Sequence, residues 1–221
     1  MQHRGGSQCP ESTGLPALKK TIRATEQDRP DVKAQRKEWA KKTADLDPKR
    51  LVFVDESGAK TNLTPRWGRL KKGRRLYDST HAGRWNTTTV VSSVRLEGST
   101  PTMVLAGACD GDAFRAYVQE VLTPSLQPGD IVVLDNLSIH KVKGITDAVE
   151  NVGAELWYLP PYSPDLNPIE KMFSKLKNSL RQAKARTQET LYEAIGNGLK
   201  TVTASDAKGW FNSCGYGYTI S

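Results

Sequence analysis

At 221 residues, the chain is long enough for one domain with a hydrophobic core and an extension, and no apolar run approaches the ~18 residues of a membrane span. A formal net charge of +8 and a pI of about 9.4 favour a polyanionic partner. Three widely spaced cysteines without a CxxC pattern argue against a disulfide framework or a zinc site, so we expect a soluble, cytoplasmic protein.

Residues 1–50 form a basic extension. The first part, to about Gly14, has no hydrophobic periodicity, which predicts disorder. A helix is expected at residues 31–44, with Val32, Trp39 and Leu46 as apolar anchors. Its many cations suit either a linker that contacts DNA or a solvated connecting helix.

Residues 51–54 are a short apolar run that leads into Asp55, which predicts a buried strand with a carboxylate at its end. The following stretch, residues 60–84, is rich in Lys and Arg and contains one acid. With Trp67 and Tyr77 interleaved, it suits phosphate contacts and stacking on unpaired nucleotides. The alternative is a solvated hairpin loop with Trp67 packed on the core. The candidate DNA-binding cations here are Arg66, Arg69, Lys71, Lys72, Arg74 and Arg75.

The middle of the chain predicts alternating strands and helices. The expected elements are an antiparallel strand pair at residues 85–95 and 100–106, a helix from Asp110 or Asp112 through Val121, a strand at Ile131–Leu134, a helix at residues 142–152 and a strand at residues 155–159. The strand at Ile131–Leu134 leads into a second carboxylate, Asp135.

Asp55 and Asp135 together indicate a metal site more strongly than either residue does alone. Open α/β sheets bind ligands at the carboxyl ends of their strands. If the two strands are parallel neighbours, ~4.8 Å apart, both acids can share an ion. Either Asp alone is better explained as a strand-end turn residue. His140, which lies five residues after Asp135, is more simply a loop hydrogen-bond partner than a metal ligand.

Residues 162–170, with the sequence YSPDLNPIE, form a proline-punctuated loop that leads into a helix. Pro164 and Pro168 restrict the backbone. Asn167 is a suitable N-cap and Pro168 suits the first helical position, which places Glu170 at position N3. Glu170 is therefore either a metal-ligating carboxylate or one half of a capping box.

The helix that starts here is expected to run to about Arg186, followed by closing helices at residues 187–200 and 205–212. Residues 171–186 contain six cations and no acid. Lys177 and Arg181 lie within about 20° of Glu170 around the helix axis. This face suits contact with a polyanion, and both cations are candidate DNA-binding residues.

Three segments together resemble the catalytic domain of DDE transposases: VDESG at residues 54–58, Asp135-Asn136 with His140-Lys141, and the loop of residues 160–170. The chain is most similar to the bacterial insertion-sequence branch of the Tc/mariner superfamily, which is related to retroviral integrases. In that branch 34 residues typically precede the final Glu, as residues 136–169 do here. The resemblance covers about residues 51–211. It implies an RNase H-like α/β fold, with a central mixed five-stranded sheet flanked by helices.

The same resemblance implies that Asp55, Asp135 and Glu170 are the catalytic, metal-binding triad. Three carboxylates without a His or Cys cluster favour Mg²⁺ or Mn²⁺ over zinc. Two such ions can support the in-line displacement of a phosphodiester, with Asp55 and Asp135 bridging them and Glu170 completing the second. Glu56 points to the opposite side of its strand and is left out.

The family likeness also implies DNA partners: transposon ends, target DNA and a homodimer assembled on them, near the nucleoid. Similar proteins carry paired helix-turn-helix modules ahead of the catalytic domain, and residues 1–50 are too short for two. We therefore expect residues 1–50 to be the remnant of such a module with its linker. Residues 51–221 are expected to be the catalytic domain of a shortened protein.

Three alternatives stay open at this point. An RNase H-like nuclease or resolvase would share the acids but not the loop of residues 162–170. A phosphatase with an aspartyl nucleophile would need Asp-x-Asp after the first strand, where Ser57 stands instead. The non-enzymatic alternative is an inactive, DNA-binding transposase remnant, which lacks metal-dependent nicking activity.

Overall fold

The structure, a computed structural model, describes residues 24–65, 69, 71, 73–75, 77, 87–99 and 101–217. The described strands are β1 (Leu51–Ala59), β2 (Thr88–Arg95), β3 (Gly98–Ser99), β4 (Met103–Ala106), β5 (Ile131–Leu134) and β6 (Glu155–Tyr158). The described α-helices are α1 (Pro30–Thr43), α2 (Gly111–Tyr117), α3 (Ile145–Glu150), α4 (Pro168–Ala183), α5 (Gln188–Lys200) and α6 (Ala204–Ser213). Within this part of the chain, no helix is long and apolar enough to cross a membrane.

The strands form one mixed sheet in the order β3-β2-β1-β5-β6, and β4 also pairs with β2. β3 pairs with the end of β2 at Val94 and Arg95, whereas β4 pairs with its beginning at Thr88–Val91, so the two short strands share one position beside β2. β1 pairs antiparallel with β2 and parallel with β5, which pairs parallel with β6. The predicted mixed sheet with five strand positions is confirmed.

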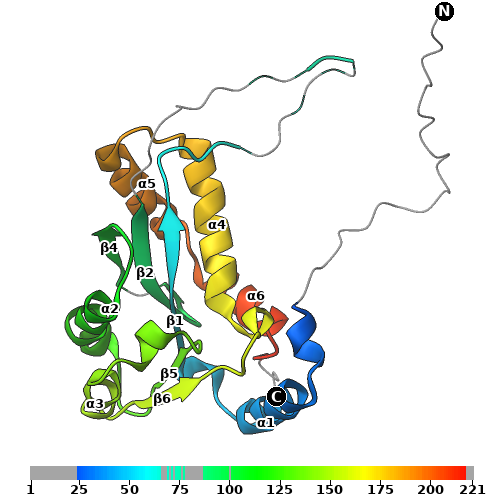
Figure 1. Cartoon of the computed structure of the whole chain (residues 1–221), viewed down its shortest axis with the longest axis vertical. Coiled ribbons are helices and arrows are strands. Elements are labelled where there is room, and N and C mark those ends of the chain that lie inside the picture. Colours follow the sequence, from blue (N-terminus) through cyan, green and yellow to red (C-terminus); the bar gives the residue numbers. More distant parts are fainter. Residues whose placement is uncertain are drawn as a thin grey trace, which may run out of the picture.

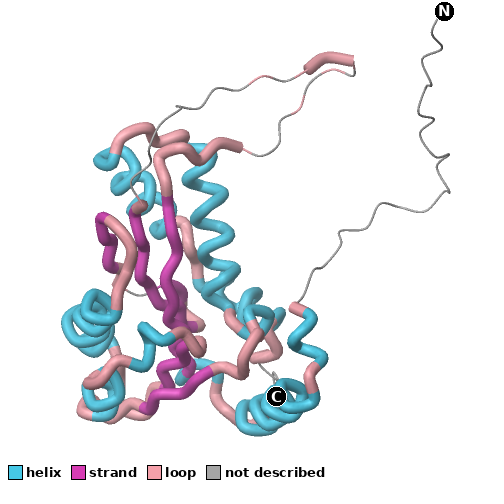
Figure 2. The backbone as a smooth tube through the Cα atoms, viewed as in Figure 1, coloured by secondary structure: helices cyan, strands magenta, loops and turns pink. Residues whose placement is uncertain are grey.

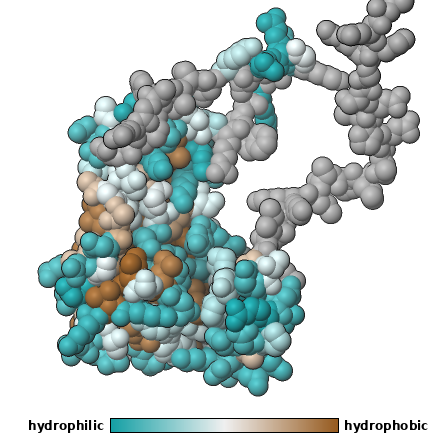
Figure 3. Space-filling model, viewed as in Figure 1, coloured by the Kyte–Doolittle hydropathy of each residue, from teal (hydrophilic) through white to brown (hydrophobic). Residues whose placement is uncertain are grey.

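Helices cover both faces of this sheet (Figures 1 and 2). Because side chains alternate along a strand, β1 contributes to two separate cores. Leu51 and Phe53 pack in the core that α1, α4, α5 and α6 cover. Val52 and Val54 pack in the core that α2 and α3 cover. The face in Figure 3 is mostly hydrophilic around a patch of apolar surface in its lower half.

β1 is longer than the sequence predicts. It continues through Ala59, and residues 56–59 pair with β2, so the expectation that the strand ends at Asp55 is wrong. Ser57 and Gly58 suggest a turn in the sequence, but pairing with the β-branched strand β2 keeps them extended. β5, however, does end at Leu134. Asp55 therefore lies where β1 runs on past the end of its parallel neighbour.

Three helix boundaries also differ from expectation. α3 begins only at Ile145, because Gly144 has a left-handed φ of 91° that breaks the helix before it. α2 ends at Tyr117 and continues as a π-helical turn to Leu122; its N-cap is Asp110, whose side chain accepts from Ala113 N at 2.8 Å. α4 ends at Ala183, since Lys184 takes a left-handed φ of 49°.

The basic face expected over residues 171–186 is smaller than the sequence indicates, because two of these six cations, one on α4 and one after it, stabilise the fold. Lys175 Nζ pairs with Asp206 Oδ2 at 2.6 Å, which joins α4 to α6. Arg186 Nη1 donates to Thr61 O at 3.0 Å and anchors the chain that follows β1.

α1 is part of the packed structure. Val32 and Trp39 are buried, and Leu46 packs against the same core, as their apolar character predicts. Trp39 Nε1 also donates to the hydroxyl of Tyr216 at 2.9 Å. The helix is thus held to the sheet layer and to the end of the described chain.

Candidate active site

The pairing of β1 with β5 brings Asp55 and Asp135 together. Phe53 is opposite Val133 in the parallel register, and the two acids lie two residues further along their chains. Because side chains alternate along a strand, Asp55 and Asp135 are on the same face of the sheet as Phe53 and Val133. That face packs toward α4. The two strands are therefore parallel neighbours, which is the condition under which both acids can share an ion. Asp55, Asp135 and Glu170 line one cavity of about 440 Å³.

Asp55 is the most enclosed of the three acids, with 7% of its surface exposed. Its Oδ1 accepts from Glu56 N at 2.8 Å, and its Oδ2 accepts from Asn167 Nδ2 at 3.1 Å. Burial, followed by the charges of Glu56 and Asp135, raises the pKa of Asp55 to about 8. The carboxylate form of Asp55 therefore lacks a compensating positive charge.

Glu170 lies at the start of α4, as the sequence predicts, and its side chain is exposed at the cavity. The N-cap is Asn167, but its side chain makes no capping hydrogen bond, because it is turned toward Asp55. By contrast, α5 and α6 both begin with a complete capping box, at Thr187 and Thr203. The geometry thus offers no support for the capping-box interpretation of Glu170.

Asp135 follows the end of β5 and accepts from Leu137 N at 2.9 Å. Its Oδ1 also lies 2.7 Å from Nδ1 of His140, which a 3-10 turn at Ser138–Lys141 folds back toward it. Burial raises the pKa of Asp135, but His140 and Leu137 N outweigh burial and hold this pKa below its ordinary value.

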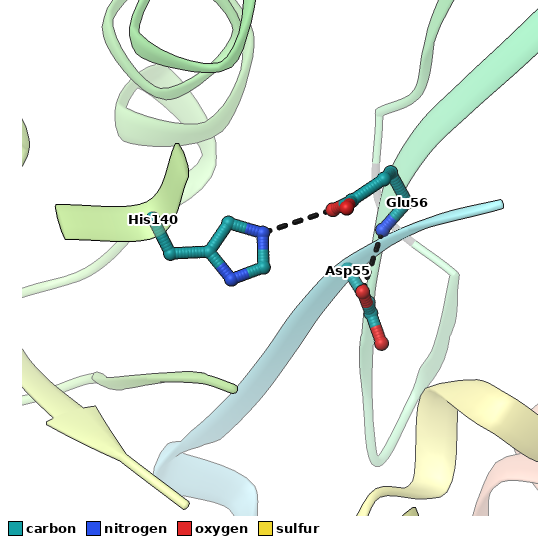
Figure 4. Close-up of side chains that lie close together, drawn as sticks. All are labelled: Asp55, Glu56 and His140. Atoms are coloured by element: carbon teal, nitrogen blue, oxygen red, sulfur yellow. Dashed lines mark hydrogen bonds and ion pairs between the residues drawn. The ribbon is translucent and has the colours of Figure 1, made fainter. Parts of the chain in front are cut away.

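His140 joins Asp135 to the other face of β1. Its Nε2 lies 2.9 Å from Oε2 of Glu56 (Figure 4), and its ring packs on Phe114 with the centroids 4.3 Å apart. Burial alone would lower the pKa of His140, but Asp135 and Glu56 raise it to about 9. The prediction of a hydrogen-bonding loop histidine is confirmed. Glu56 does lie on the opposite face from Asp55, yet His140 connects it to Asp135, and no local sequence pattern indicates this connection.

Two groups of side chains are candidates to hold a metal ion. The ligand atoms of Asp55, Glu56 and His140 all lie within 4.8 Å of one another. However, Nε2 of His140 hydrogen-bonds to Glu56, and Nδ1 faces Asp135 Oδ1 at 2.7 Å although it makes no well-aligned hydrogen bond, so neither nitrogen faces an open position for an ion. The acids that line the cavity fit better.

The cavity matches the requirements of a hard divalent cation. Its three acids offer only oxygen ligands, which Mg²⁺ and Mn²⁺ prefer. Asn167 Oδ1 is a buried acceptor without a hydrogen-bond partner among the described residues. Burial and the neighbouring carboxylates raise the pKa of Asp55, and a bound cation would offset the repulsion between these carboxylates.

The loop before Glu170 is held by residues from the N-terminal extension. Arg36 makes a two-pronged contact with Asp165, at 3.0 and 2.6 Å, and also donates to Ser163 Oγ at 2.6 Å. Gln27 Nε2 donates to Tyr162 O at 2.6 Å. The sequence of this extension predicts no such role, because its cations indicate a solvated face or a contact with DNA.

The candidate DNA-binding cations are partly accessible. Arg69, Lys71, Arg74 and Arg75 are exposed between β1 and β2, whereas Arg66 and Lys72 lie outside the described residues. On α4, Lys177 and Arg181 are half-exposed, and Arg181 Nη1 donates to Asn178 at 2.8 Å. DNA contacts by these residues stay a prediction.

Comparison with known proteins gives a family and a fold. A family model described as a DDE superfamily endonuclease matches residues 50–192. The pre-cleavage Mos1 transpososome aligns with a TM-score of 0.71 and 13% identity, over 96% of this chain and 69% of that chain. The catalytic domain of Mos1 mariner transposase aligns with a TM-score of 0.61 and 12% identity, over 90% and 92%. No curated protein sequence matches. These structural likenesses confirm the RNase H-like fold.

Proposed function

Because the chain belongs to the DDE superfamily of endonucleases, we propose that it is a transposase catalytic domain that cleaves DNA phosphodiesters and transfers the cut strand to target DNA. The observation that carries this proposal is the convergence of Asp55, Asp135 and Glu170 on one cavity. The three acids come from β1, the end of β5 and the first turn of α4. We assign them as the metal-binding triad.

In this assignment the chain positions its own carboxylates before substrate binds. Glu56 N and Asn167 hold Asp55, while His140 and Leu137 N hold Asp135. One or two Mg²⁺ or Mn²⁺ ions bound by these acids would activate the attacking water or 3′-hydroxyl and stabilise the leaving oxygen. Paired-end complexes of Mos1 with Mg and with Mn support this choice of ion.

The partners follow from the same likeness. The similar structures include Mos1 paired-end and strand transfer complexes, which supports a homodimer of this chain on transposon ends. The chain spans 64% of the Mos1 chain in the paired-end complex with the left transposon end. We therefore propose the chemistry of cleavage and joining for this chain, with the bacterial insertion-sequence branch as its origin.

Nicking of a supercoiled plasmid tests the proposal. The purified protein should nick DNA with Mg²⁺ or Mn²⁺ and not with EDTA, and Asp135→Ala should abolish nicking while DNA binding survives. A pre-cut duplex with a free 3′-hydroxyl should be joined to the plasmid under the same conditions. Nicking by Asp135→Ala at the wild-type rate would overturn the triad. A folded wild-type protein without metal-dependent nicking would overturn the enzymatic function.

A further inference from the structure

The rim of the acid cavity exposes two apolar side chains. Tyr162 and Leu137 are each 47% exposed, although large apolar residues are usually buried. Both line the same cavity as the three acids. Leu137 follows Asp135 by two residues, and Tyr162 begins the loop that leads to Glu170. The cavity therefore combines a carboxylate floor with an apolar edge.

The backbone of Tyr162 is held in an unfavourable conformation. Its φ is 55°, a left-handed value that bulky residues rarely adopt. The other described non-glycine residue with positive φ, Lys184, ends α4, so a helix terminus explains it. No helix ends at Tyr162, where Gln27 binds its carbonyl oxygen at 2.6 Å and Arg36 binds the next side chain, Ser163. Strain that the surroundings hold in this way is typical of functional sites.

We propose that Tyr162, together with Leu137, binds an unpaired nucleobase next to the phosphate on which the acids act. The inference rests on the proposed function, because divalent cations held by the acids would place a phosphate in the cavity. The base attached to that nucleotide must then leave the cavity past its edge. An exposed tyrosine offers a flat face on which any base can stack, whereas a phosphate gains nothing from an apolar edge.

The rest of the cavity wall agrees with this occupant. Leu159, Pro160 and Pro161 also line it, so the surface beside the acids has apolar stretches that suit a ring system. The excess of positive charge on the chain favours a nucleic acid over an acidic or neutral apolar ligand that lacks a base.

Fluorescence of 2-aminopurine can measure this contact without catalysis. The probe is a duplex with a short single-stranded overhang that carries 2-aminopurine, bound to the full chain with Ca²⁺, a hard cation that takes oxygen ligands. Stacking on Tyr162 should quench the probe. Tyr162→Gly removes the ring and accepts the left-handed φ, so the loop should keep its shape. It should abolish quenching and weaken overhang binding about tenfold, with binding of a blunt duplex unchanged.

Two further variants sharpen the test. Tyr162→Trp keeps a stacking face and should retain quenching. Tyr192→Gly removes another exposed tyrosine, on α5, and should leave overhang binding unchanged. Unchanged quenching in Tyr162→Gly, or equal losses for overhang and blunt DNA, would overturn the inference. Failure of the proposed enzymatic function shows separately, as a wild-type protein that quenches the probe but does not nick a plasmid with Mg²⁺.

Discussion

Asn167, the N-cap of the helix that carries Glu170, donates a hydrogen bond of 3.1 Å to Asp55 in the central strand. The bond spans 112 positions in the sequence and fixes the start of α4 against β1. The side chain that would ordinarily cap α4 is thus used to fix Asp55 relative to Glu170. The positions of Asp55 and Glu170 are therefore coupled, and several measurements can test the consequences.

Glu170→Gln should separate metal binding from helix stability. Because Glu170 takes part in no capping box, the unfolding free energy of the metal-free variant should stay within about 0.5 kcal/mol of wild type, the effect of one charge at a helix start. The stabilisation that Mg²⁺ or Mn²⁺ adds should shrink, and nicking should fall by orders of magnitude. Thermal melts with and without metal measure the first two effects.

Glu189→Gln is the matched control, since Glu189 is an acid in the first turn of α5 and does not line the cavity. It should leave metal stabilisation and nicking unchanged. A Glu170→Gln variant that melts early but cleaves normally would contradict the metal-ligand assignment.

The raised pKa of Asp55, about 8, predicts a pH-dependent instability of the metal-free protein. The folded pKa of Asp55 lies above its ordinary value of 3.8, so the neutral acid is favoured in the folded state. Stability should then fall as pH rises from about 4 to about 8. Asp55→Asn should remove this part of the pH dependence and stabilise the metal-free protein at pH 9 by at least about 1 kcal/mol.

Asp130 provides the opposite case. It is about as buried as Asp55, but it pairs with Arg95, so Asp130→Asn should destabilise the protein at pH 9. Denaturant melts across pH measure both variants. Equal destabilisation by the two substitutions would show that the carboxylate of Asp55 does not lower the unfolding free energy of the metal-free protein.

Charge reversal at Lys177 and Arg181 should weaken DNA binding without changing sequence preference. If each cation contacts one phosphate, the double variant should flatten the salt dependence by about 2 in a log–log plot. The same reversal at Lys200, exposed on α5, is the control and should have little effect. Titrations at several salt concentrations measure the slope, and an unchanged slope would remove both residues from the DNA contact.

The contact between Arg36 and Asp165 should matter more for activity than for stability. The pair is partly exposed, at 24% and 51% of the two side chains, so its loss should cost no more than about 1 kcal/mol. Arg36→Ala and Asp165→Asn should each slow nicking about tenfold or more, because the loop that positions Glu170 is released. The double variant should be no slower than the singles.

Arg29→Ala breaks an exposed pair with Asp31 in the same part of the chain and should leave nicking unchanged. Additive losses in the Arg36 and Asp165 variants would mean that the two residues do not act through their contact.

The sequence predicts the acids better than it predicts their supports. The alternation of Leu51 to Asp55 and the apolar run before Asp135 are local patterns, and they specify the strand faces correctly. Arg36 and Asp165, by contrast, are 129 positions apart, and nothing in the local periodicity of either segment indicates the other. The continuation of β1 past Asp55 also depends on pairing with a distant strand.

The loop before Glu170 is held from both ends of the described chain. Gln27 and Arg36, near the start of the described chain, donate hydrogen bonds to the loop. Near its end, the hydroxyl of Tyr216 donates to Leu166 O at 2.8 Å. A fragment trimmed to begin at Leu51 would retain the strands of the sheet and all three acids but lose Gln27 and Arg36. Trimming before Tyr216 would remove the hydrogen bond to Leu166 O. A fragment that begins at Leu51 would also lose the buried side chains of α1, so the end points chosen for a shortened protein would affect both its core and the position of Glu170.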